Sequence, residues 1–174
     1  MVTTLPALEP ATISIADDPA AWDAYVSAHP DASGYHAWAW RRVFEDAFGH
    51  ETAYLAARRG GRIAGVLPIV LFRSTLFGRF AVSLPFVNYG GVLADDAEAA
   101  DALIASARRL LERRGARHLE LRHRVRRFAD LPAKDHKVTL LLDLPRTEDE
   151  CWQALDRKVR NQVRKAEKSG LTAT

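Results

Sequence analysis

Hydrophobic residues along this chain alternate with polar ones in some segments and recur every three or four positions in others. Because successive side chains of a strand point to opposite faces, the first pattern predicts strands. We place them at residues 12–16, 50–59, 62–73, 80–86, 117–122 and 137–144. The wider spacing predicts helices at residues 18–28, 36–48, 95–114, 147–155 and 157–168. This order of elements predicts an α/β (α+β) protein with a mixed sheet covered by helices.

Turn and capping residues mark the ends of several predicted elements. Gly60 and Gly61 predict a tight turn that joins the strands before and after them into a hairpin. Asp95 and Glu98 form a capping-box pattern at the start of the longest predicted helix. Gly115 is placed to end that helix in a left-handed conformation.

Pro68 lies inside the predicted strand that follows the hairpin turn. Proline has no backbone N–H and therefore cannot donate to a strand ladder. We expect a bulge or an unpaired edge at this position, which would splay the sheet and open a cleft.

Composition places the chain among ordinary globular proteins. Of 174 residues, 48% are hydrophobic and 27% are charged, which is enough apolar material for one respectable core. No apolar run is long enough for a membrane-spanning helix, and no signal peptide is visible, so we expect a cytoplasmic protein. Cys151 is the single cysteine, and the histidines do not have metal-ligand spacing, so we predict neither a disulfide nor a metal site.

Charge is distributed unevenly along the chain. Residues 1–101 contain 7 Lys and Arg against 12 Asp and Glu, whereas residues 102–174 contain 18 against 10. The predicted helix 157–168 alone holds six cations and one acid, Glu167. Such a surface favours an anionic partner, although a solvated helix face explains it equally well.

Several motifs in order resemble the FemAB-like acyltransferases, especially the exosortase-associated branch. These motifs are W-R-R-V-F-E-D-A-F-G-H, G-R-I-A-G-V-L-P-I-V, S-L-P-F-V-N-Y-G-G-V-L-A-D, H-L-E-L-R and R-K-V-R-N-Q-V-R-K-A-E-K-S-G-L. Together they span about residues 22–171. The resemblance implies a GNAT-like fold, with a mixed, mostly antiparallel sheet flanked by helices.

The resemblance also implies an organisation and an activity. Residues 1–145 would form a GNAT-like N-terminal domain, and residues 146–174 a basic helical segment leading into a second GNAT-like domain that this chain does not contain. The family transfers acyl or aminoacyl groups to cell-envelope or exopolysaccharide precursors. The full-length enzyme would use an aminoacyl-tRNA or acyl-CoA donor, and we expect no cofactor in this chain. The R/Q-x-x-G-x-G/A loop that holds coenzyme A is missing from the sequence.

Candidate site residues come from two parts of the sequence. Asn88 and Tyr89 follow a predicted strand and precede two glycines, so an amide, a phenol and backbone N–H groups could converge on a ligand there, although a simple turn is the commoner use of glycines. Arg122 could hold a carboxylate or phosphate, or could pair with Glu120 on the same strand face. The cations expected to grip an anionic small-molecule or carrier-linked acceptor are Lys158, Arg160 and Arg164. No catalytic residue can be assigned.

Three alternative interpretations stay open at this point. The chain could be a stand-alone GNAT-type N-acetyltransferase that uses acetyl-CoA. It could be a non-catalytic basic module that binds tRNA or another RNA. It could also form a homodimer through the unpaired strand expected at residues 171–174.

Overall fold

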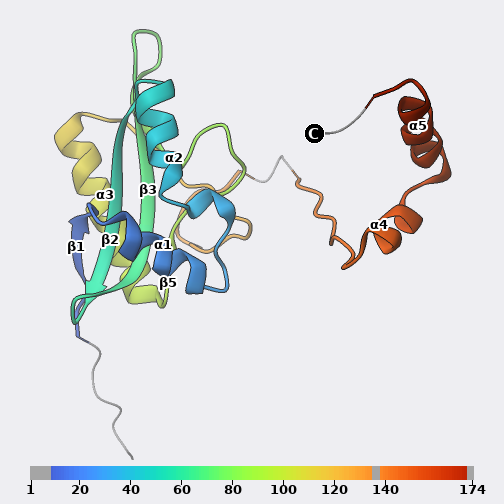
Figure 1. Ribbon diagram of the computed structural model, residues 1–174. Coiled ribbons are helices and arrows are strands. Elements are labelled where there is room, and N and C mark those ends of the chain that lie inside the picture. The colour runs from blue at the N-terminus through green and yellow to red at the C-terminus, as the bar shows by residue number, and fades with distance from the viewer. Residues whose placement is uncertain (1–8, 135–137, 172–174) are drawn as a thin grey trace, which may run out of the picture. The chain divides into compact units, whose positions relative to one another are not determined.

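The computed structural model describes residues 9–134 and 138–171 of the chain. Contacts divide the chain into two units, with the boundary after Leu131. The first unit contains the sheet, and the second contains two helices (Figure 1). Within the described residues, none of the helices is long and apolar enough to cross a membrane.

The first unit is built on one mixed sheet, which confirms the predicted fold class. Its strands are β1 Thr12–Ile15, β2 Glu51–Arg59, β3 Arg62–Ser74, β4 Gly78–Val82, β5 Leu93–Ala94 and β6 Leu119–Glu120. They lie in the order β1-β2-β3-β4-β6, and β5 also pairs with β3. All pairs are antiparallel except β4 with β6, which run parallel.

The predicted hairpin is confirmed as β2 and β3. Gly60 and Gly61 join the strands with φ values of +52° and +80°, which glycine adopts without steric cost. Strand alternation then divides the apolar residues of β3 between two cores: Leu67 and Ile69 belong to one, and Val70 belongs to the other.

Helices cover both faces of this sheet (Figure 1). They are α1 Pro19–Ala28, α2 Ala39–Arg42 and α3 Ala97–Arg114, with a 3₁₀ turn at Gly34–His36 and a π-helical turn at Val43–Ala47. The stripe of α3 that the sequence predicts is buried against one face of the sheet, at Ala100, Leu103, Ile104, Ala107, Leu110 and Leu111. Trp22 of α1 and Phe44 of the π-helical turn pack on the opposite face.

The start of α3 differs from the sequence prediction by one residue. Asp96 is the N-cap, and its side chain accepts a hydrogen bond from the Ala99 N–H at 2.9 Å. The neighbouring Asp95 instead accepts a hydrogen bond from the Tyr25 hydroxyl at 2.9 Å. Gly115 ends the helix with φ +63°, as predicted.

The helix predicted over 36–48 is confirmed only in its later part, where α2 continues directly into the π-helical turn, while its predicted start lies in the separate 3₁₀ turn. The backbone becomes extended at Ala37, with ψ 141°. In addition, the indole N–H of Trp22 donates to the His36 carbonyl at 2.7 Å. That carbonyl is therefore engaged by a side chain that approaches from another helix.

Two strands are shorter in the structure than the sequence predicts. The strand predicted over 80–86 ends at Val82, because Leu84 and Phe86 have φ values of +55° and +65°, which no strand accommodates. The strand predicted over 117–122 is reduced to the two residues of β6.

The second unit contains α4 Glu148–Ala154 and α5 Arg157–Lys168. Thr147 caps α4 by accepting from the Glu150 N–H, and Asp156 caps α5 by accepting from the Lys158 N–H. The strand predicted over 137–144 is not formed in its described part, residues 138–144, where the apolar side chains are exposed. These residues have strand-like composition, but in the described chain they pair with no strand of the sheet.

Candidate functional site

Strand β3 changes partners along one of its edges. Gly65 and Val66 pair with β5, whereas residues 70–74 pair with β4. Pro68 lies between these two stretches, within the residues 67–69 that pair with neither strand in the described sheet. The unpaired edge expected at Pro68 is therefore confirmed. The chain leaves the sheet after β4 and returns at β5, and we call the intervening residues the 83–92 segment.

The 83–92 segment has an unusual backbone. Leu84 and Phe86 both occupy the left-handed region, which is costly for residues with a side chain. Leu84 is fully buried and Phe86 is 69% exposed. The Phe86 ring lies 5.3 Å from that of Phe48, centroid to centroid. The surrounding structure thus holds the segment in a conformation that its own residues do not favour.

Arg122 contacts this segment through both its side chain and its backbone. Its Nη1 donates to the Val87 carbonyl at 2.7 Å, and its Nε donates to Glu120 Oε1 at 2.8 Å. Its backbone N–H donates to Ser83 Oγ at 2.8 Å. The ion pair with Glu120 that the sequence allows is therefore present, and part of the guanidinium is engaged within the protein.

The predicted ligand groups of the N-Y-G-G motif have different surroundings. Asn88 is exposed, while Tyr89 is half-buried with its ring 6.3 Å from that of Tyr35. Gly91 is buried, and its N–H donates to the Arg122 carbonyl at 2.8 Å. The side chain of Asn88 is thus the most accessible polar group of the motif, whereas the Gly91 N–H is already engaged.

Two histidines that the sequence does not single out bind the end of the segment. His36 Nε2 lies 3.2 Å from the Gly91 carbonyl, and His123 Nε2 accepts from the Val92 N–H at 2.9 Å. Burial lowers the pKa of both imidazoles, that of His123 to about 4. No local sequence pattern predicts that these histidines bind the 83–92 segment, because the contacts join residues far apart in sequence.

Helix α5 carries the other predicted site residues. At about 100° per residue, its six cations fall within an arc of about 160°, and Val159, Val163 and Ala166 lie on the opposite side. In the described residues, no ion pair includes a cation of this helix. The Arg164 guanidinium lies over the Trp152 ring at 5.4 Å.

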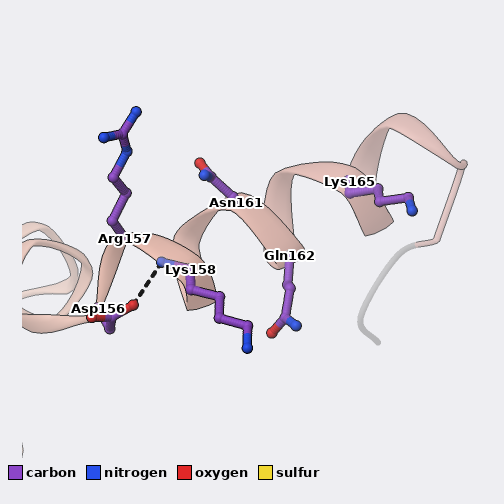
Figure 2. Close-up of a pocket in the computed structure, with 6 residues that line it drawn as sticks. All are labelled: Asp156, Arg157, Lys158, Asn161, Gln162 and Lys165. Carbon is purple, nitrogen blue, oxygen red and sulfur yellow. Dashed lines mark hydrogen bonds between the residues drawn. The ribbon is translucent and has the colours of Figure 1, made fainter.

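Figure 2 shows the polar surface of α5 in detail. Lys158 and Gln162 project to one side, and Arg157 and Asn161 project to another. An open hollow of about 550 Å³ lies over these residues together with Asp156 and Lys165. Because every lining residue belongs to one helix or its N-cap, the hollow has no opposing wall and is an open surface rather than an enclosed pocket.

The predicted site residues therefore form two groups. Arg122 contacts the segment that carries Asn88 and Tyr89, in the first unit. Lys158, Arg160 and Arg164 lie together on α5, in the second unit. Among the described residues, no group of three or more His, Cys, Asp or Glu side chains is placed to hold a metal ion.

Comparison with known proteins gives no match to a family model, to a curated protein or to a solved structure.

Proposed function

We propose that this chain is the acceptor-binding part of a FemAB-like acyl or aminoacyl transferase that acts on a cell-envelope or exopolysaccharide precursor. The order of the sequence motifs supports this proposal, and so does a mixed sheet whose central strand β3 changes partners at Pro68. The observation that carries it is the cationic face of α5. Six basic side chains on one face, outside all the ion pairs of the described residues, favour a polyanionic ligand.

The acceptor would bind through its phosphate groups. Arg160 and Arg164 are one helical turn apart and can donate to oxygens of the same diphosphate, while Lys158 extends the cationic surface around the helix. The Trp152 ring beside Arg164 restrains that guanidinium and provides an apolar contact for a sugar or base. These features support a nucleotide-linked or carrier-linked diphosphate as the acceptor.

A titration with a uridine diphosphate sugar tests the acceptor site. We expect binding at about 0.05 M salt that weakens strongly at about 0.5 M, because exposed ion pairs are screened. The double variant Arg160→Gln/Arg164→Gln should lose about tenfold in affinity, since each exposed pair contributes up to about 1 kcal/mol. Arg108→Gln/Arg109→Gln, which removes two exposed arginines of α3, is the matched control and should bind like the wild type.

The same titration separates this proposal from its alternatives. Wild-type binding that is absent at both salt concentrations contradicts an anionic acceptor site. Tight binding of tRNA, with a steep salt slope and little sequence preference, favours the non-catalytic RNA-binding module. Turnover of acetyl-CoA by this chain alone favours the self-contained acetyltransferase.

A further inference from the structure

The turn between β3 and β4 presents two large apolar side chains to solvent. Leu76 is 80% exposed and Phe77 is 70% exposed. Their backbone N–H groups donate to Ser74 Oγ at 3.2 and 3.1 Å, so the turn has a defined conformation. Figure 1 shows this hairpin extending past the helices at one end of the sheet. Adjacent apolar residues at a protruding tip are costly in water and favour a contact with an apolar phase.

Arginines gather on one face of the base of the same hairpin. Arg73 and Arg79 form the second strand pair from the turn, after Ser74–Gly78, and together with Arg114 they line a hollow of about 80 Å³. The Arg79 Nη1 donates to the Arg114 carbonyl at 3.0 Å, which holds the hairpin against the end of α3. Glu51, which pairs with Arg114, is the one acid among the residues lining this hollow.

A fourth arginine extends this basic rim. The Arg117 guanidinium lies against Gly78, the residue that begins β4 directly after the tip. The rim and the tip are close, because strand residues rise by about 3.3 Å and the Arg73–Arg79 pair is separated from the turn by a single residue pair. An apolar end is thus followed, within about 10 Å along the hairpin, by a cluster of positive charge.

We propose that this hairpin binds the surface of an anionic phospholipid membrane. Leu76 and Phe77 enter the boundary between headgroups and acyl chains, and Arg73, Arg79, Arg114 and Arg117 contact the lipid phosphates. The charge pattern selects this occupant: an apolar tip that projects beyond a basic rim complements a layer that is apolar inside and negative at its surface. The inference uses the first unit only and does not depend on the acceptor site proposed for α5.

Sedimentation of the full chain with vesicles tests the proposal. We expect binding to equimolar phosphatidylcholine and phosphatidylglycerol, and much weaker binding to phosphatidylcholine alone. Leu76→Ser/Phe77→Ser should weaken partitioning about tenfold or more, because two apolar side chains no longer leave water. Replacing Arg73 or Arg79 by Gln should cost about fivefold each on anionic vesicles.

The second unit requires a matched control, because it also exposes apolar and basic side chains. Leu140→Ser/Leu142→Ser removes two exposed apolar side chains from residues 138–144, as the tip variant does from the hairpin, and should leave vesicle binding unchanged. An environment-sensitive dye on Leu76→Cys, in a Cys151→Ser background, should brighten on anionic vesicles. The same dye on Arg108→Cys of α3 should not.

Three results would overturn the inference. The first is vesicle binding that survives Leu76→Ser/Phe77→Ser but is lost in Leu140→Ser/Leu142→Ser. The second is a dye at residue 76 that does not respond to any vesicle. The third is concentration-dependent self-association that is abolished by the tip variant, which would make the tip a contact between two copies of the chain.

Discussion

His36 and His123, 87 positions apart in sequence, bind the two ends of one peptide group. His36 Nε2 contacts the carbonyl of Gly91, and His123 Nε2 accepts from the N–H of Val92, which belongs to the same peptide. Because Val92 donates, His123 Nε2 carries no proton. The Ser33 N–H donates to His36 Nδ1, so the proton of His36 is on Nε2, where it can donate to Gly91. The Val92–His123 contact and the Ser33–His36 contact therefore require neutral imidazoles.

This arrangement predicts a stability that falls in mild acid. Burial places the pKa of both histidines below their ordinary value of about 6.5. The unfolded chain consequently binds more protons, so the stability present above about pH 6.5 is lost as the pH falls toward about 4, where His123 titrates in the folded protein. Urea unfolding followed by tryptophan fluorescence at a series of pH values measures this loss.

A glutamine at position 123 provides the control for that experiment. His123→Gln keeps an acceptor near the position of Nε2 but does not titrate in this range. We expect its stability to change less than that of the wild type between about pH 6.5 and about pH 4. An unchanged pH profile in His123→Gln would show that other groups carry the acid sensitivity.

Gly91 should not tolerate a side chain. A Cβ at this position would collide with the His123 ring and lie 2.7 Å from the Arg122 carbonyl. Gly91→Ala should therefore destabilise the first unit by about 1–3 kcal/mol in urea unfolding. Gly34→Ala is the matched control, because a Cβ there meets nothing within 4 Å and its cost should stay below about 1 kcal/mol. Equal effects of the two variants would contradict the close approach at Gly91.

Asp96 should contribute more to stability than its neighbour Asp95. It caps α3 and pairs with Arg59, which lowers the pKa of its carboxyl to about 2. Asp96→Ala should cost about 1–3 kcal/mol at neutral pH, and Asp95→Ala less than about 1 kcal/mol. The contribution of Asp96 is complete above its ordinary pKa of about 4 and disappears as the pH falls to about 2. This pH range lies below the one in which the histidines titrate. Unfolding of Asp96→Ala and of His123→Gln at a series of acid pH values therefore separates the contribution of Asp96 from that of His123.

Sequence patterns predicted the elements that local chemistry determines. The Gly60–Gly61 turn, the buried stripe of α3 and the unpaired edge at Pro68 each follow from residues close together in the chain. The pattern failed where a distant group decides the conformation. The Trp22 indole donates to the His36 carbonyl, and the segment in which Leu84 and Phe86 are left-handed is contacted by Arg122, His36 and His123 from other parts of the chain.

The candidate site residues show the same division. The cationic face of α5 is visible in the sequence, because helical spacing alone brings its residues together. The roles of Arg122 and His123 could not be predicted, because each depends on the path of the 83–92 segment in space. Asp95 and Asp96 were confused for a simpler reason: both are good caps, and only the position of Arg59 and Glu98 in the fold distinguishes them.

Residues 138–144 predict a tendency of the chain to self-associate. Val138 and Leu140 are 87% and 92% exposed, in a run whose composition favours a strand. Unpaired segments of this kind template pairing with an identical segment of another copy. Sedimentation velocity should therefore show association that increases with protein concentration. Leu140→Lys/Leu142→Lys should suppress it, because it replaces two of the apolar side chains that would pack between the copies.

A substitution within the same run tests whether the apolar side chains cause this association. Thr139→Lys/Asp143→Asn changes the local charge in the same direction but keeps every leucine and valine of residues 138–144. If apolar contacts drive the pairing, this variant should still associate at high concentration, whereas the leucine variant should sediment as a monomer. If both variants remain associated to the same extent, the contact between copies lies elsewhere, and residues 138–144 are exposed without a role in assembly.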